Sequence, residues 1–231
     1  FTFKSAIAGG LTIDSVGAQN GVAASGAISI RQETAGGITV NQDVVSSGGD
    51  VTLENTSSTG AITIASTQKV SGDNVSVSTA GGAITLNGDL KATTFTATLN
   101  SGAGAISGSG VVKANTIALQ SSGGTGDVGN GSVAFNTSTV DGTGTANISI
   151  GRTISGPSGP AAVYFSHTGG ANFTHLITTG AGTPVSISAT GDLTTGSVGA
   201  GTSNLSLSSG GVLTLSTGAV LAGKNISLVS D

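Results

Sequence analysis

The sequence predicts an all-β fold, a right-handed parallel β-helix (β-solenoid) whose coils each take roughly 20–24 residues. Three observations predict it. A short tripeptide of the form aliphatic–Thr/Ser–aliphatic recurs along the chain, its copies are regularly spaced, and turn-forming glycines separate them, with 40 glycines in 231 residues. No stretch places helix-forming residues at a period of 3.6, which argues against helices.

The tripeptide has the pattern of a very short β-strand. Alternation with a period of two places both aliphatic side chains on one face and the hydroxyl on the other. We therefore expect Ile84 and Leu86 to lie in a core and Thr85 to face solvent. Clear copies begin at Leu11, Ile28, Ile38, Val51, Ile62, Val75, Ile84, Ile148, Val185, Leu205, Leu213 and Ile226, and looser copies begin at Phe95, Ile117 and Val133.

The spacing of the tripeptides indicates stacked coils. Alternate copies begin at Ile28, Val51, Val75 and Phe95, so that one coil length separates each from the next. One coil cannot bury its aliphatic side chains alone, so successive coils stack at about 4.8 Å and share a narrow core. An antiparallel sandwich is the alternative, but its core normally holds large aromatic residues, and these make up only 3% of the chain.

We expect residues 1–231 to form a single β-helical shaft fragment with an irregular stretch at 120–183. The chain begins with FTFK, which has neither an initiator Met nor the pattern of a signal peptide, so we interpret it as a fragment. In the middle of the chain the apolar tripeptides begin at Ile117, Val133, Ile148 and Val163, and these are further apart than the copies before them. Longer spacing predicts longer coils there and a protruding loop.

Charge narrows the range of partners. The formal net charge is −4, and the seven Lys and Arg residues are spread along the sequence. Because a nucleic-acid-binding surface needs clustered basic residues, we expect no nucleic-acid partner. The chain also has no cysteine, which fits an exported protein without disulfides, and no run of 18 apolar residues that could span a membrane as a helix.

Three strings carry a family resemblance: GAITLNGDL at 82–90, GGVLTL at 210–215 and AGKNISL at 222–228. They resemble the repeats of filamentous-haemagglutinin-like exoproteins, which are bacterial adhesins exported by two-partner secretion. The resemblance implies a β-helical shaft that is secreted to the bacterial cell surface and serves in cell adhesion or filament building. The secretion domain of that family carries Asn-Pro motifs, and this chain has none, so it resembles the shaft. Autotransporter passengers have similar repeats, and the export route stays open between the two.

The same resemblance implies several partners. An outer-membrane partner transporter would export the protein. Neighbouring repeats of the same polypeptide, or other copies of it, would stack on the coils at either end. Glycans or proteins of a host or neighbouring cell are the candidate ligands of the adhesive role.

Four candidate ligand contacts fall in one segment, 152–175, which also holds two of the three prolines. They are Arg152, Tyr164, His167 and His175. Tyrosine and arginine bury contact area at small entropic cost, so this segment is the place where a glycan-binding loop is expected. The alternative is a structural loop that packs Tyr164 and Phe165 over the core.

Catalytic or metal chemistry has weaker support in the sequence. The eleven acidic residues mostly lie beside glycine or asparagine, as turn residues do, although Asp50 and Asp73 are about one coil apart. The two histidines have no cysteine or paired carboxylate near them in sequence, so we expect exposed loop histidines, no metal site and no cofactor. We therefore expect no enzyme, and the alternative is a carbohydrate-active enzyme with carboxylates clustered on a β-helix.

Asparagine precedes several of the predicted strands in Asn-x-Ser/Thr triplets. Stacked turn asparagines could bond to one another along the solenoid, or the same triplets could accept glycans. The sequence leaves both interpretations open. The triplets begin at Asn55, Asn74, Asn130, Asn136, Asn147, Asn172, Asn204 and Asn225.

Overall fold

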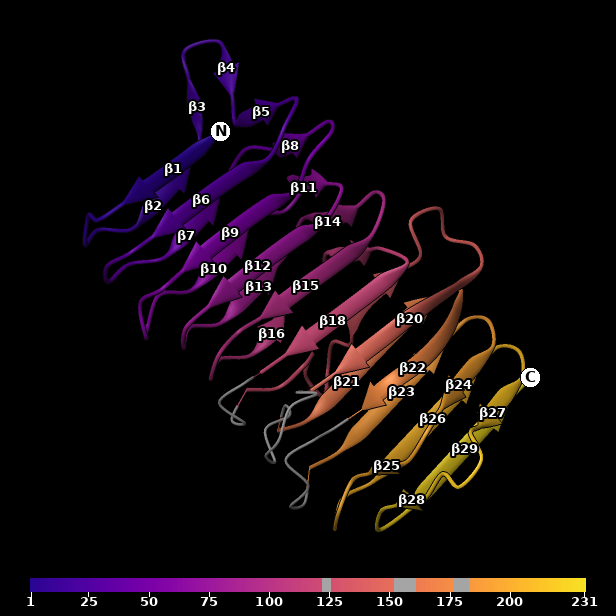
Figure 1. Ribbon diagram of the computed structural model, residues 1–231. Coiled ribbons are helices and arrows are strands. Elements are labelled where there is room, and N and C mark those ends of the chain that lie inside the picture. The colour runs from indigo at the N-terminus through magenta and orange to yellow at the C-terminus, as the bar shows by residue number, and fades with distance from the viewer. Residues whose placement is uncertain (122–125, 152–160, 177–182) are drawn as a thin grey trace.

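The computed structural model describes residues 1–121, 126–151, 161–176 and 183–231, and these form a β-solenoid of about nine turns (Figure 1). Parallel strands stack from one coil to the next, and the described residues contain no helix. The predicted parallel β-solenoid is confirmed, and the sandwich alternative is wrong. Arg152 and the rest of residues 152–160 of the expected loop lie outside the described residues.

Each coil contributes strands to up to three walls that run along the solenoid. The first wall contains β1 (Thr2–Ser5), β6 (Ile28–Gln32), β9 (Val51–Asn55), β12 (Val75–Thr79), β15 (Thr96–Asn100), β18 (Thr116–Gln120), β20 (Thr145–Ile150), β22 (Gly170–Leu176), β24 (Leu193–Thr195) and β27 (Leu213–Leu215). The second wall contains β5 (Val22–Ala24), β8 (Val44–Ser46), β11 (Lys69–Gly72), β14 (Asp89–Ala92), β17 (Val111–Lys113), β19 (Phe135–Ser138), β21 (Val163–Thr168), β23 (Val185–Ala189), β26 (Leu205–Ser209) and β29 (Ile226–Ser230). The third wall contains β2 (Leu11–Ile13), β7 (Ile38–Val40), β10 (Ile62–Ile64), β13 (Ile84–Leu86) and β16 (Ile106–Ser107).

Two short pairs complete the described strands. Near the C-terminal end, β25 (Val198–Gly199) pairs in parallel with β28 (Leu221–Ala222). Near the N-terminal end, β3 (Ser15–Val16) and β4 (Gln19–Asn20) form an antiparallel hairpin that projects from the solenoid (Figure 1). The hairpin was not predicted, because such short strands carry no alternation that a sequence pattern can detect.

The strand register gives the coil length directly. In the first wall Ile28 aligns with Val51, Val51 with Val75 and Val75 with Ala97. Each of these steps falls within the predicted coil length. One step is much longer, because Ile117 aligns with Ile148. The extra residues of that coil lie between β18 and β20, which is part of the stretch where the tripeptides are widely spaced.

The core is a set of aliphatic columns, one residue per coil. Ile38, Ile62, Ile84 and Ile106 are register partners on the third wall, and each is at most 1% exposed. Thr85, between two core residues, faces outward as predicted. Burying each such aliphatic side chain contributes roughly 1.5–3 kcal/mol. The core therefore depends on every coil placing its aliphatic residues in register with those of the neighbouring coils.

For two of the looser tripeptides, the predicted strand begins too early. Phe95 is 58% exposed and Val133 is 45% exposed, although both were expected to begin strands. Each lies in the turn that precedes its strand, and the buried residues are Ala97 and Phe135 two positions later. The predicted alternation was correct, but the first residue of each of these two tripeptides lies in a turn rather than in the strand.

A column of polar side chains is also buried, at the edge of the first wall. Ser5, Gln32, Asn55 and Thr79 are register partners at the ends of their strands. Gln32 donates from Nε2 to the Ile7 carbonyl oxygen at 2.7 Å, and Asn55 donates from Nδ2 to the Gly36 carbonyl oxygen at 2.8 Å. These side chains satisfy turn carbonyls that the sheet hydrogen bonds do not reach.

The register predicts how Ile84→Asp and Thr85→Asp differ. Aspartate at position 84 would bury an unpaired carboxylate in the core, so we expect the free energy of unfolding to fall by about 3–5 kcal/mol. Aspartate at position 85 adds the same group on the outer face and should cost less than about 1 kcal/mol. Urea denaturation of both variants is the measurement, and equal losses would show that the register is wrong.

Candidate functional site

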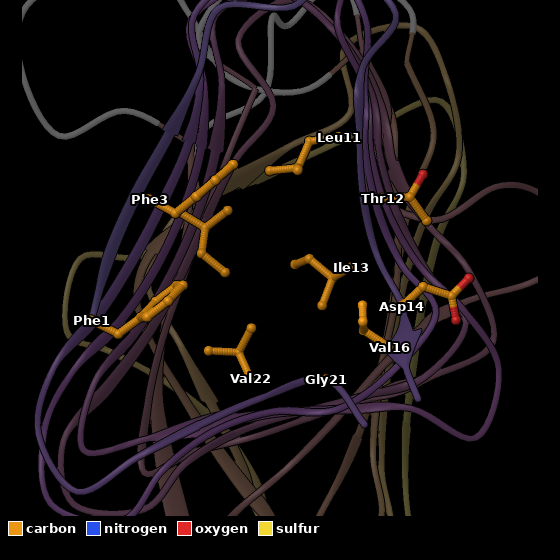
Figure 2. Close-up of a pocket in the computed structure, with 10 residues that line it drawn as sticks. Phe1, Phe3, Leu11, Thr12, Ile13, Asp14, Val16, Gly21 and Val22 are labelled. Atoms are coloured by element: carbon orange, nitrogen blue, oxygen red, sulfur yellow. The ribbon is translucent and has the colours of Figure 1, made fainter. Parts of the chain in front are cut away.

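An apolar pocket of about 260 Å³ lies at the N-terminal end of the solenoid (Figure 2). Phe1 just before β1, Phe3 of β1, Leu11 and Ile13 of β2 and Val22 of β5 point into it, whereas the Asp14 carboxylate points away. These are the same inward positions that form the core in later coils. The pocket is therefore the open end of the hydrophobic core, and its lining offers apolar contact rather than catalytic groups.

The acidic residues that a β-helix hydrolase would need serve instead as links between coils. Asp50 Oδ1 accepts the backbone N–H of Asn74 at 3.1 Å, and Asp192 Oδ1 accepts that of Val212 at 2.8 Å. Asp43, Asp89 and Asp127 make the same kind of bond to Lys69, Val111 and Ala162. A carboxylate that accepts a backbone N–H of the next coil strengthens the stack at its turn.

Asp50 and Asp73 are about one coil apart in the sequence, but they do not stack. The register places Asn74 beside Asp50, and Asn74 donates from Nδ2 to Asp50 Oδ1 at 2.9 Å. Asp73 instead lies beside Gly49 of the preceding coil, because the Asp73 backbone N–H donates to the Gly49 carbonyl oxygen. The coil there is slightly longer than the separation of the two aspartates, so they fall out of register.

His167 lies in strand β21 and is fully buried, so the prediction of an exposed loop histidine is wrong for it. Val163, Phe165 and His167 alternate with outward residues, and all three point into the core. His167 Nδ1 is 2.8 Å from Thr137 Oγ1, and the imidazole stacks parallel to the Phe165 ring at 6.5 Å between centroids. Its Nε2 is buried without a hydrogen-bond partner among the described residues.

Burial lowers the pKa of His167 from 6.5 to about 4, because the charged imidazolium would lose its hydration in the core. The nearby backbone of Gly170 raises the pKa and opposes this shift only in part. His167 is consequently neutral at pH 7. A neutral, enclosed imidazole acts as a core residue rather than as an acid–base group open to a substrate.

The other predicted ligand contacts are not brought together in the described part of the chain. Tyr164 is half-buried on the outer face of β21 and lies beside Gly131. His175 lies in β22, on a different wall, and its side chain is outside the described residues, as is all of Arg152. Tyr164 and His167 thus belong to a wall strand and point to opposite faces of it, which corrects their expected place in a loop.

Asparagine ladders are present where two pairs of the Asn-x-Ser/Thr triplets stack. Asn172 donates from Nδ2 to Asn147 Oδ1 at 3.0 Å, and Asn225 donates to Asn204 Oδ1 at 2.9 Å. The first pair lies within the paired strands β20 and β22, and the second pair directly precedes β26 and β29. The amide of Asn172 and that of Asn225 are engaged in the stack, which favours the structural interpretation of these triplets.

The described residues define this protein as a β-solenoid. No group of three or more His, Cys, Asp or Glu residues within the described ranges is placed to hold a metal ion. No helix there is long and apolar enough to cross a membrane. Comparisons with protein-family models, curated proteins and solved structures found no match.

Burial of His167 predicts that acid destabilises the fold. The unfolded chain binds a proton at this residue below pH 6.5, whereas the folded chain does so only near pH 4. Stability is therefore complete above pH 6.5 and falls by about 3 kcal/mol as the pH decreases to about 4. Chemical denaturation across this range is the measurement.

The control for this prediction is His167→Gln, which removes the titrating group and keeps a polar side chain. Whatever its stability at pH 7, the variant should lose the decline between pH 6.5 and pH 4. A variant with the same decline as the parent would show that His167 is not its source.

Proposed function

We propose that this chain is a structural and adhesive shaft module of a secreted or surface-attached bacterial exoprotein. One observation carries the proposal: parallel strands continue from coil to coil along the described solenoid. About nine turns at a rise of about 4.8 Å give a rod roughly 40 Å long. Such a rod resists bending because each coil is bonded to the next along all of its walls.

The outer faces support the same role. Thr12, Thr39, Thr63 and Thr85 form an outward column of hydroxyl groups on the third wall. Hydroxyl columns keep a wall hydrated without charge, and charged residues make up only 8% of the chain. A surface of this kind suits a module that holds other parts of a protein at a distance from the cell.

The resemblance to filamentous-haemagglutinin-like exoproteins supports export to the cell surface by an outer-membrane partner transporter. The exposed core at the N-terminal end and the exposed strand β29 at the other end would each accept a further coil. In this proposal the neighbours are repeats of the same polypeptide or other copies of it. Filament formation would follow if other copies stack there.

Two alternatives compete with the shaft. Glycan binding through the segment 152–175 would use Tyr164 as its aromatic anchor. A carbohydrate-active enzyme would need a group of carboxylates free to act on a substrate, whereas several described aspartates accept backbone N–H groups of the next coil. That use of the carboxylates favours the structural role.

The shaft proposal predicts that adhesion depends more on the length of this segment than on which residues its surface carries. In the producing bacterium, deletion of this segment should reduce adhesion, because the remaining protein reaches less far. Replacement by an unrelated β-solenoid of equal length should restore adhesion to at least half of the original level. Cell-adhesion counts are the measurement, with antibody labelling of intact cells to confirm surface exposure.

The outcome that contradicts the shaft role is also clear. If the replacement is displayed at the surface but adhesion stays at the level of the deletion, the residues of this chain bind directly. Adhesion lost on Tyr164→Ala alone would then assign that binding to the segment 152–175.

The exposed ends predict self-association of the 231-residue chain. Phe3 and Leu228 are 42% and 46% exposed and belong to strands that lack a neighbour on one side. Substituting both by lysine should reduce oligomers in analytical ultracentrifugation, because charge blocks edge pairing. Ser76→Lys, on the outer face of β12, is the control and should leave association unchanged. A strict monomer at high concentration would contradict the prediction.

A further inference from the structure

Three lysines lie on successive coils of the second wall. They are Lys69 in β11, Lys91 in β14 and Lys113 in β17. Lys91 and Lys113 are one coil length apart, whereas Lys69 is offset by two residues from their column, since Ser71 is the partner of Lys91. In the sequence the basic residues are spread along the chain, and the match between the coil length and the spacing of Lys91 and Lys113 was missed.

The three lysines open onto one groove. Lys91 and Lys113 are direct register partners, and Lys69 is paired with Asp89 one coil further on. All three line a groove of about 480 Å³ together with the turn at 138–142. The groove thus crosses four successive coils in the direction of the solenoid axis.

Not all of this positive charge is neutralised by the described residues. Lys113 Nζ is 2.6 Å from Asp89 Oδ2, so that pair is an ion pair. The ammonium groups of Lys69 and Lys91 have no ion pair among the described residues. Asp43 faces the same turn and accepts the Lys69 backbone N–H at 2.7 Å.

Asp141 is the acidic residue of the turn at 138–142 that lines the groove. Its carboxylate accepts the Thr143 backbone N–H at 3.1 Å, and this bond lowers its pKa. Asp141 therefore stays charged and is held in its own turn. An anion in the groove would be repelled from that turn and held against the lysines.

The lysine pair is costly for a purely structural wall. Like charges directly opposite one another on neighbouring strands destabilise a sheet. The equivalent outward positions of the third wall hold the hydroxyl column of Thr39, Thr63 and Thr85, which carries no such penalty. A role in binding accounts for lysines at this place, where the fold alone would be satisfied by threonine or serine.

We infer that the groove formed by Lys69, Lys91, Lys113 and the turn at 138–142 binds a carboxylated polysaccharide that lies along the solenoid axis. One sugar residue extends such a polymer by about the rise of one coil, so carboxylates of neighbouring sugar residues can meet Lys91 and Lys113, with Lys69 offset to one side. Among the described residues, no aromatic side chain lines the groove to stack on a base, which disfavours single-stranded nucleic acid.

The affinity of one groove is modest. An exposed ion pair contributes at most roughly fivefold to a binding constant, and salt weakens it further. A polymer that contacts several copies of the protein at a surface gains strength through avidity. This inference does not depend on the shaft proposal, because a rod that fails as a spacer could still bind a polyanion.

The test is titration calorimetry of the 231-residue chain with polygalacturonate at low salt. Lys91→Gln should weaken binding roughly threefold to fivefold, and the triple variant with Lys69→Gln and Lys113→Gln should weaken it by at least tenfold. Lys224→Gln removes the same charge from an exposed site near the C-terminal end and is the matched control. Equal weakening by Lys224→Gln would overturn the inference, because only net charge would matter.

Further measurements keep the result interpretable. Neutral dextran should not bind, and equal binding of dextran would overturn the role of the carboxylates. Tighter binding of single-stranded DNA than of polygalacturonate would overturn the choice of partner. Lys91→Gln should unfold at the same urea concentration as the parent or higher, since it relieves the repulsion with Lys113. Lost binding in a stable variant therefore reports on the groove and not on misfolding.

Discussion

Backbone hydrogen bonding between successive parallel coils is the interaction on which this structure depends. Because each strand bonds to the strand one coil away, every side chain is stacked on the residue at the same place in the next coil. The same stacking brings turn backbones very close together. A Cβ atom at Gly110 would collide with the Gly88 carbonyl oxygen, so glycine is required where one turn covers another. Columns of like residues and glycine-rich turns are two results of one constraint.

The sequence predicted the coils well because aliphatic columns have a strong signature. Val75 and Val77 are buried as the tripeptide requires. The prediction failed where a turn replaced the start of a strand. Phe95 has the same parity as the buried residues Ala97 and Leu99, yet the chain bends before β15 and leaves Phe95 exposed. Alternation predicts which face a strand residue takes but not where the strand begins, since hydrogen bonds between coils decide that.

Polar residues were harder to place for a related reason. Gln32 and Asn55 are buried, their amides bond to turn carbonyls, and each has the strand parity of the buried aliphatic residues before it. His167 likewise alternates with Val163 and Phe165. It was missed because the two histidines were treated as loop residues. For a solenoid, strand parity is better evidence for burial than residue type.

Backbone hydrogen bonds between coils hold each wall together, so its outward side chains are free to vary. A binding surface is therefore best sought where outward residues differ from the repeating hydroxyl columns. Hydroxyl columns such as that of Thr39 and Thr63 follow the repeat and require no partner to explain them. The column that contains Lys91 and Lys113 departs from it and carries an electrostatic cost. The N-terminal pocket, although apolar, does not depart from the repeat, because it is the core seen from its end. On this solenoid, the charge of Lys91, which has no ion pair among the described residues, is therefore stronger evidence for a binding surface than the open end of the core is.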